Sequence, residues 1–154
     1  MLFCGINPGL LSAAKRQHFA RPGNRFWRTL HEAGFTERVF APAEQRELLA
    51  RGIGITNLVA RATASAAELS RAELVAGRRK LAAKVRRYRP RALAVLGIDA
   101  YRQAFEQPRA APGLQPERFG ETPLWVLPNP SGLNAHYQLP ALVSLYRDVL
   151  GRGR

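Results

Sequence analysis

Short apolar runs alternate along this chain with longer segments in which apolar residues recur every three or four positions. Most of these runs end at Gly or just before Pro, which are typical of turns that follow strands. The run over residues 92–97 is continuously apolar, as expected of a strand covered on both faces of a parallel sheet. Four strands are predicted in this way, at residues 2–5, 53–59, 92–97 and 124–127.

The segments between these strands carry the apolar spacing of helices. The clearest helix start is Ser70, because Glu73 completes a capping box and Leu69 with Leu74 supplies a hydrophobic staple. Helices are predicted near residues 24–34, 42–52, 70–88, 99–105 and 140–150, and loops over residues 10–23, 60–69 and 108–123.

Alternating strands and helices predict an α/β fold. We expect a single domain over residues 1–154, with three αβα layers and a central, mostly parallel four-stranded sheet. In such a sheet, functional side chains gather where the carboxyl ends of the strands meet. The segments expected at that edge are residues 6–24, 57–65, 97–99 and 128–137.

Net charge is the most informative feature of the composition. The chain carries 24 Lys and Arg residues against 11 Asp and Glu residues, for a net charge of +13. A genome that prefers Arg explains the excess of Arg over Lys, but it does not explain the net charge. Such an excess favours a polyanionic partner, and nucleic acid is the expected one.

Other classes of protein are disfavoured by the sequence. No apolar run approaches the ~20 residues of a membrane-spanning helix, and the start lacks the pattern of a signal peptide. Cys4 is the single cysteine, which excludes a disulfide within the chain and a four-thiolate iron–sulfur cluster. The three histidines lack ligand spacing, so we expect no metal and no cofactor, in a cytoplasmic protein.

Two predicted strands end in related Asn/Pro/Gly motifs, Gly-Ile-Asn-Pro-Gly at residues 5–9 and Pro-Asn-Pro-Ser-Gly-Leu at residues 128–133. Either motif alone is also explained by an ordinary turn. Together with Phe-Ala at residues 19–20 and Asn-Arg-Phe-Trp at residues 24–27, they give the chain a close resemblance, over nearly its whole length, to the mismatch-specific uracil/thymine DNA glycosylase family of the uracil-DNA glycosylase superfamily. The resemblance implies a uracil-DNA glycosylase-like fold and excision of uracil from DNA, especially from G:U mismatches, leaving an abasic site without a cofactor.

The resemblance also implies roles for individual residues. Asn7 matches the catalytic Asn, which positions a water and contacts the base. The chain near Ile6 and Phe19 is expected to supply backbone N–H donors to the base, and the Phe19 ring to stack on it. Phe19 could instead be a core aromatic residue, although its loop position speaks against this. Leu133 matches the apolar side chain that fills the gap left by a flipped base.

The motif around Leu133 is expected to bind the DNA backbone. The predicted DNA-binding residues are Ser12, Asn129, Ser131, Gly132, Leu133 and Asn134. Some relatives carry an Arg just after the Leu that reads the opposite guanine, whereas this chain has Asn-Ala-His at residues 134–136. Asn134 or His136 could substitute, and strict preference for guanine stays open.

Asp99 follows a predicted strand at the same sheet edge as Asn7. It could cap the next helix, or it could be a second catalytic carboxylate. In the second case the enzyme would be a broad uracil and damaged-pyrimidine glycosylase that also acts on U:A pairs and single-stranded DNA. The sequence is also compatible with a non-catalytic nucleic-acid-binding relative and with a small-molecule nucleotide hydrolase, although the missing phosphate loop disfavours the hydrolase. The expected partners are double-stranded DNA containing uracil mismatches and the abasic-site product, bound by a monomer of bacterial type that associates with the nucleoid.

Overall fold

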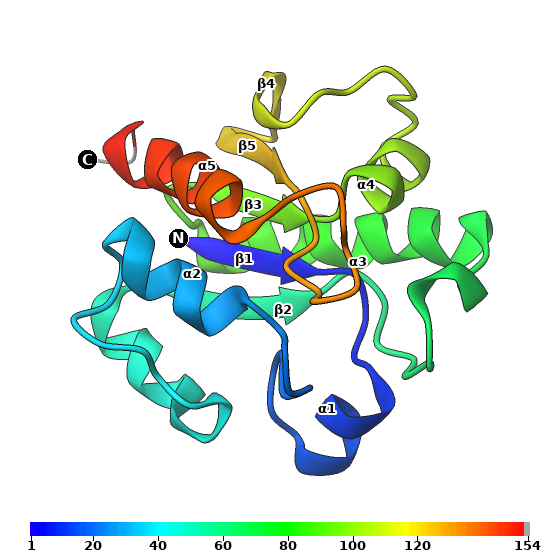
Figure 1. Cartoon of the computed structure of the whole chain (residues 1–154). Coiled ribbons are helices and arrows are strands. Elements are labelled where there is room, and N and C mark those ends of the chain that lie inside the picture. Colours follow the sequence, from blue (N-terminus) through cyan, green and yellow to red (C-terminus); the bar gives the residue numbers. More distant parts are fainter. Residues whose placement is uncertain (153–154) are drawn as a thin grey trace.

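A five-stranded sheet forms the middle layer of the computed structural model, which describes residues 1–152 (Figure 1). The strands lie in the order β2-β1-β3-β5-β4. Neighbours among the first four pair in parallel, and β4 pairs antiparallel with β5. Their bounds are β1 Leu2–Gly5, β2 Gly54–Asn57, β3 Leu93–Leu96, β4 Gly113–Phe119 and β5 Thr122–Leu127.

Helices cover both faces of the sheet. In Figure 1, α2 and α5 lie on one side, and α3 and α4 lie on the other. This arrangement confirms the predicted mixed α/β class with a mostly parallel central sheet. The helices are α1 Leu10–Lys15, α2 Phe26–Ala33, α3 Arg71–Tyr88, α4 Ile98–Ala104 and α5 Leu139–Arg152, with 3₁₀ helices η1 Pro42–Arg51 and η2 Ala66–Glu68.

Each face of the sheet has its own hydrophobic core, because successive side chains of a strand point to opposite faces. In β1, Phe3 packs in the core beneath α2 and α5, and Cys4 packs in the core beneath α3 and α4. Trp125 and Val126 of β5 divide between the two cores in the same way. Burial on both faces explains why these strands are continuously apolar in the sequence.

The prediction of four strands was wrong by one, since β4 occupies part of the predicted loop over residues 108–123. Pro116 lies within this strand, and the pairing with β5 shifts register between Leu114 and Arg118. Proline is tolerated on an edge strand or at a bulge, where its missing N–H costs no ladder hydrogen bond. Most side chains of β4 are also exposed, so the strand lacks an apolar pattern.

The predicted loop over residues 10–23 also contains a helix, α1. This helix buries none of its six residues, so it has no apolar face for the pattern to reveal. At α3, by contrast, the predicted capping box is confirmed. The Glu73 N–H donates to Ser70 Oγ at 3.1 Å, and the Ser70 N–H donates to Glu73 Oε2 at 2.8 Å.

None of the helices within residues 1–152 combines the length and apolar character needed to cross a membrane. The single domain predicted over residues 1–154 stays a prediction, and its last two residues lie outside the described part of the chain.

Candidate functional site

A groove of about 1290 Å³ runs along the edge where the parallel strands end. Its walls come from all four segments expected at that edge. The predicted site residues among its lining are Ile6, Asn7, Ser12, Phe19, Asp99, Asn129, Ser131, Leu133 and Asn134. Gly132 is not part of the lining; it lies against the backbone of Gly23, where an added Cβ would come within 2.6 Å of the Gly23 carbonyl oxygen.

The Asn7 side chain is held by two hydrogen bonds from its amide nitrogen. Nδ2 donates to the Arg61 carbonyl oxygen and to Thr63 Oγ1, both at 2.8 Å. Thr63 Oγ1 donates its own proton to the Ser65 carbonyl at 2.8 Å, so it can only accept from Asn7. Since both partners are acceptors, a flipped amide would bring Oδ1 against two oxygens. The contacts therefore leave Oδ1 as the acceptor available to a molecule in the groove.

Backbone hydrogen bonds hold the segment after β2 against the segment after β1. The Leu58 N–H donates to the Gly5 carbonyl at 2.8 Å, and the Thr63 N–H donates to the Pro8 carbonyl at 3.2 Å. Gly9 and Thr63 form an isolated parallel bridge. The Asn7 amide and its acceptors thus lie on two segments that stay hydrogen-bonded beyond the ends of β1 and β2. The sequence analysis missed the part played by Thr63.

Phe19 lies beside the end of β1 with a left-handed backbone, at φ 51°. Its half-buried ring packs on Phe26, with 4.2 Å between ring centroids, and lines the groove. A Cβ on Gly5 would lie 3.2 Å from Phe19 Cζ, so glycine admits the ring at the strand end. Among the hydrogen bonds of residues 1–152, none is donated by the backbone N–H of Ile6 or Phe19.

Asn57 is a further polar residue in the groove that the sequence analysis did not select. It is the last residue of β2, and its Oδ1 would lie 2.7 Å from a Cβ at Gly5. Within the described chain, its side-chain amide makes no hydrogen bond. Its place in residues 57–65, a segment expected at the functional edge of the sheet, was the signal that could have identified it.

The segment over residues 128–137, which we call the wedge loop, carries the most exposed large apolar side chain at the groove. Leu133 is 73% exposed. Beneath it, Asn129 Oδ1 accepts from the Ser131 N–H at 3.0 Å, and Ser131 Oγ accepts from the Leu133 N–H at 3.2 Å. The predicted DNA-binding side chains of the wedge loop therefore also shape its backbone.

Asn134 and His136 differ in how far the wedge loop engages their side chains. Asn134 Nδ2 donates to the Asn129 carbonyl at 3.1 Å, and its Oδ1 accepts from the His136 N–H at 3.2 Å. The Asn134 amide is thus engaged at both ends within the wedge loop, whereas the His136 side chain is exposed and lines the groove. Ser12 is likewise engaged, since its Oγ accepts from the Ala20 N–H at 3.0 Å and steadies the segment that carries Phe19.

The interpretation of Asp99 as a helix cap was wrong. The N-cap of α4 is Gly97, whose φ of 152° suits glycine, and Asp99 lies in the first turn without making a capping hydrogen bond. Gly97 is needed there because a Cβ would lie 2.7 Å from Ile6 Cδ1. The Asp99 side chain is 92% exposed and lies 3.6 Å from Arg102 in an ion pair. Its one charge partner in the described chain is thus a partly exposed side chain on its own helix, and its carboxylate lines the groove.

Positive charge predominates along the groove, whose lining includes Arg16, Arg21 and Arg102 against one carboxylate. His18 also lines it, and burial, followed by the nearby charge of Lys84, lowers the pKa of this imidazole below its usual value. The wall therefore presents a neutral ring at neutral pH, beside arginines that suit an anionic ligand. No group of three or more His, Cys, Asp or Glu side chains in residues 1–152 is placed to hold a metal ion.

A comparison with protein families gives a match that covers nearly the entire chain. The family model described as the uracil DNA glycosylase superfamily matches residues 1–150. The match includes both Asn/Pro/Gly motifs and every wall of the groove.

Proposed function

Since this chain belongs to the uracil DNA glycosylase superfamily, we propose that it is a mismatch-specific enzyme that excises uracil, especially from G:U pairs. It would be a monofunctional glycosylase that acts as a monomer and leaves an abasic site. The observation that carries the proposal is the fixed amide of Asn7, which offers an oxygen to the groove while Arg61 and Thr63 hold its nitrogen.

Hydrolysis of the bond between uracil and deoxyribose develops positive charge on the sugar and negative charge on the base. Asn7 Oδ1 accepts a hydrogen bond from a water and holds that water towards the sugar. The backbone N–H groups of Ile6 and Phe19 donate to the oxygens of the base, where charge accumulates, and Asn57 offers a further amide to its edge. An amide is not a strong base, so the departure of uracil carries much of the reaction. Uracil leaves more readily than an ordinary pyrimidine, which favours damaged DNA.

The base has to leave the duplex before it reaches Asn7. Flipping costs a few kcal/mol and is cheapest at a mismatch, which supports a preference for G:U over U:A. Leu133 fills the gap in the stack, because it is the exposed apolar side chain at the tip of the wedge loop. Phe19 then covers the flipped base with its ring. The arginines along the groove meet the DNA backbone.

We assign contact with the opposite strand to His136 and not to Asn134. The Asn134 amide is engaged within the wedge loop, whereas the His136 side chain is exposed three residues after Leu133. The imidazole offers one donor and one acceptor, in contrast to the fork of an arginine. An imidazole would therefore distinguish guanine from adenine in the opposite strand less strongly than a two-point contact from an arginine does.

A broader enzyme is the second candidate, and the position of Asp99 favours it. Its carboxylate lines the same groove as Asn7 and makes no capping hydrogen bond. As a second catalytic group, it would activate the water or stabilise the sugar cation. Activity would then extend to U:A pairs and single-stranded DNA.

Single-turnover excision from three labelled oligonucleotides tests both candidates, with uracil opposite guanine, opposite adenine or in a single strand. The wild type is compared with Asn7→Ala and Asp99→Asn. Cleavage confined to the mismatch and lost in Asn7→Ala supports the mismatch-specific enzyme. Cleavage of all three that depends on Asp99 supports the broader one. DNA binding without any cleavage would refute both and leave a non-catalytic relative.

A further inference from the structure

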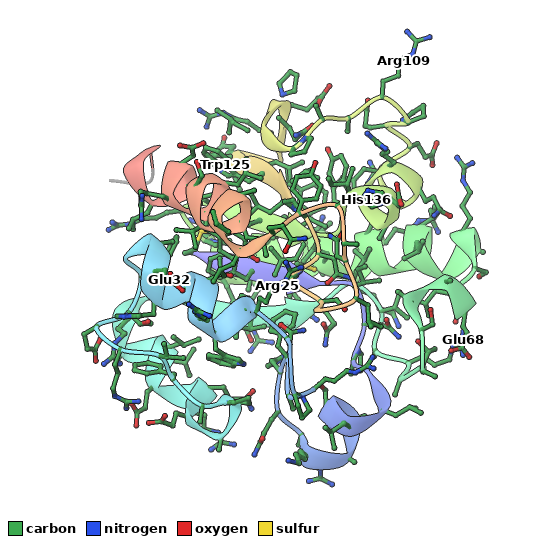
Figure 2. The ribbon with its side chains drawn as sticks, in the orientation of Figure 1. Arg25, Glu32, Glu68, Arg109, Trp125 and His136 are labelled. Atoms are coloured by element: carbon green, nitrogen blue, oxygen red, sulfur yellow. The ribbon has the colours of Figure 1, made fainter. Side chains whose placement is uncertain are left out.

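Arg25, the residue before α2, donates hydrogen bonds to backbone carbonyls throughout the wedge loop. Nε reaches the Pro130 carbonyl oxygen at 3.3 Å, and Nη2 reaches those of Ser131 at 2.7 Å and Asn134 at 3.2 Å. Nη1 donates to the carbonyl of Tyr137. The Arg25 backbone N–H adds a bond to the Pro130 carbonyl at 3.0 Å. Figure 2 shows Arg25 at the start of α2, beside the orange loop that carries His136.

The bonds from Arg25 supply donors to carbonyls of the wedge loop that no helix or strand pairs. The described residues 128–137 contain no helix or strand, so regular structure does not pair their carbonyls. A guanidinium presents five N–H donors in a rigid plane and can bind several carbonyls at fixed angles. A lysine ammonium keeps the charge but has neither the plane nor the reach to four oxygens. The guanidinium therefore sets the shape of the wedge loop.

A second contact fixes the same loop against the same segment. An added Cβ at Gly132 would lie 2.6 Å from the Gly23 carbonyl oxygen, so the two backbones touch. The segment that begins at Gly23 continues into Phe26, whose ring supports Phe19 at 4.2 Å. One short stretch of chain thus supports both the wall of the base pocket and the loop that carries Leu133.

We propose that Arg25 is a positioning residue that fixes Leu133 relative to Phe19, which lines the part of the groove that receives the flipped base. With this spacing fixed, insertion of Leu133 into the DNA stack also places the flipped base against Phe19. This inference rests on the proposed excision of a flipped uracil. Arg25 does not touch the reacting atoms. With Nε and both terminal nitrogens engaged by carbonyls, it also has little left to offer a phosphate.

The test compares excision from a G:U duplex with excision of a uracil placed in a bubble of mismatches, where flipping costs less. Arg25→Lys is expected to lower the single-turnover rate on the duplex by about tenfold, or ~1.4 kcal/mol of barrier. The rate on the bubble should fall much less. Arg28→Lys is the matched control, because Arg28 lies in the first turn of α2, is exposed and pairs with Glu32. It should leave both rates unchanged.

Leu133→Ala provides a double-mutant cycle. If Arg25 acts through the wedge, Arg25→Lys should add little to the duplex defect of Leu133→Ala. Equal losses on duplex and bubble, together with a lower Tm, would mean a merely structural role and overturn the inference. Additive losses in the cycle would overturn it as well. If Arg25→Lys fails to fold, Gly132→Ala displaces the same loop from Gly23 and should give the same selective defect.

Hydrogen exchange on the protein alone separates this inference from the proposed function. Arg25→Lys should speed amide exchange across residues 128–137 while leaving α3 unchanged. Unchanged exchange in the wedge loop would refute the role of Arg25 even if the wild type excises uracil. A wild type without excision would refute the proposed function, and the positioning role with it, although faster exchange would still show that Arg25 orders the loop.

Discussion

Replacing Thr63 by valine tests how the Asn7 amide is oriented. Thr63 is 4% exposed, and its hydroxyl accepts from Asn7 Nδ2 and donates to the Ser65 carbonyl. Valine keeps the shape of the side chain and loses both hydrogen bonds. The Arg61 carbonyl remains as the second acceptor, so the Asn7 amide stays bound at one point and gains freedom to rotate.

The size of the effect follows from the bonds that are lost. A typical hydrogen bond contributes about 0.5–1.5 kcal/mol, so two of them make Thr63→Val less stable by about 1–3 kcal/mol. One of the two bonds acts on Asn7. If this bond stabilises the transition state by about 1 kcal/mol, its loss slows excision by about fivefold.

Urea denaturation measures the stability, and single-turnover excision from a G:U duplex measures the rate. Thr63→Ser is the matched control, because it keeps the hydroxyl and both hydrogen bonds while it removes a buried methyl group. It should lose some stability and keep most of the rate. A folded Thr63→Val with the wild-type rate would refute the view that this hydroxyl orients Asn7.

Three further predictions concern the buried Gly77 and Cys4 and the half-buried His18. Gly77→Ala should lower the free energy of unfolding, measured in urea, by about 1–3 kcal/mol, because the added Cβ would lie 2.2 Å from the Leu58 carbonyl oxygen. Alanine normally stabilises a helix relative to glycine, so this sign is diagnostic. Exposed Arg79→Ala is the control, and a Gly77→Ala variant as stable as the wild type would contradict the clash. Burial raises the pKa of the Cys4 thiol to about 12, so a thiol reagent should label it only as the protein unfolds, and fast native labelling would count against this. Burial lowers the pKa of His18, so its NMR titration should have a midpoint below 6.5. The unfolded chain then binds the His18 proton at a higher pH than the folded chain, so the free energy of unfolding should fall as the pH drops below 6.5. An NMR midpoint above 6.5 would be contrary evidence.

The sequence pattern predicted those parts of the fold that bury apolar surface. The β3 strand and the helix that starts at Ser70 were recognisable because both sides of the sheet are covered and because the capping box is local. The strand β4 and the helix α1 were not, since α1 buries no side chain and β4 buries mainly Gln115. Elements of this kind form through backbone hydrogen bonds, which leave no periodicity in the side chains.

The candidate site divides in a similar way. Asn7 and Leu133 could be selected because their motifs resemble those of a known family. Besides the Thr63 hydroxyl and the side-chain bonds within the wedge loop, the contacts that orient them use main-chain carbonyls, that of Arg61 for the amide and those of Ser131 and Tyr137 for the wedge loop. Every residue has a carbonyl, so no residue type marks these acceptors in a sequence. Arg25 was visible as part of a motif, but its partners lie more than 100 positions away.

The range of substrates should depend on whether Asp99 assists the reaction. The Asn7 amide can orient a water but cannot remove its proton effectively, so an enzyme that relies on it depends on the leaving group. Asp99 is 92% exposed beside Arg102, where water screens its charge. Bound DNA would exclude that water and strengthen the field of the carboxylate at the sugar. With this second group, the reaction depends less on easy flipping at a mismatch, so Asp99→Asn should slow single-turnover excision more from a single strand and a U:A pair than from a G:U duplex.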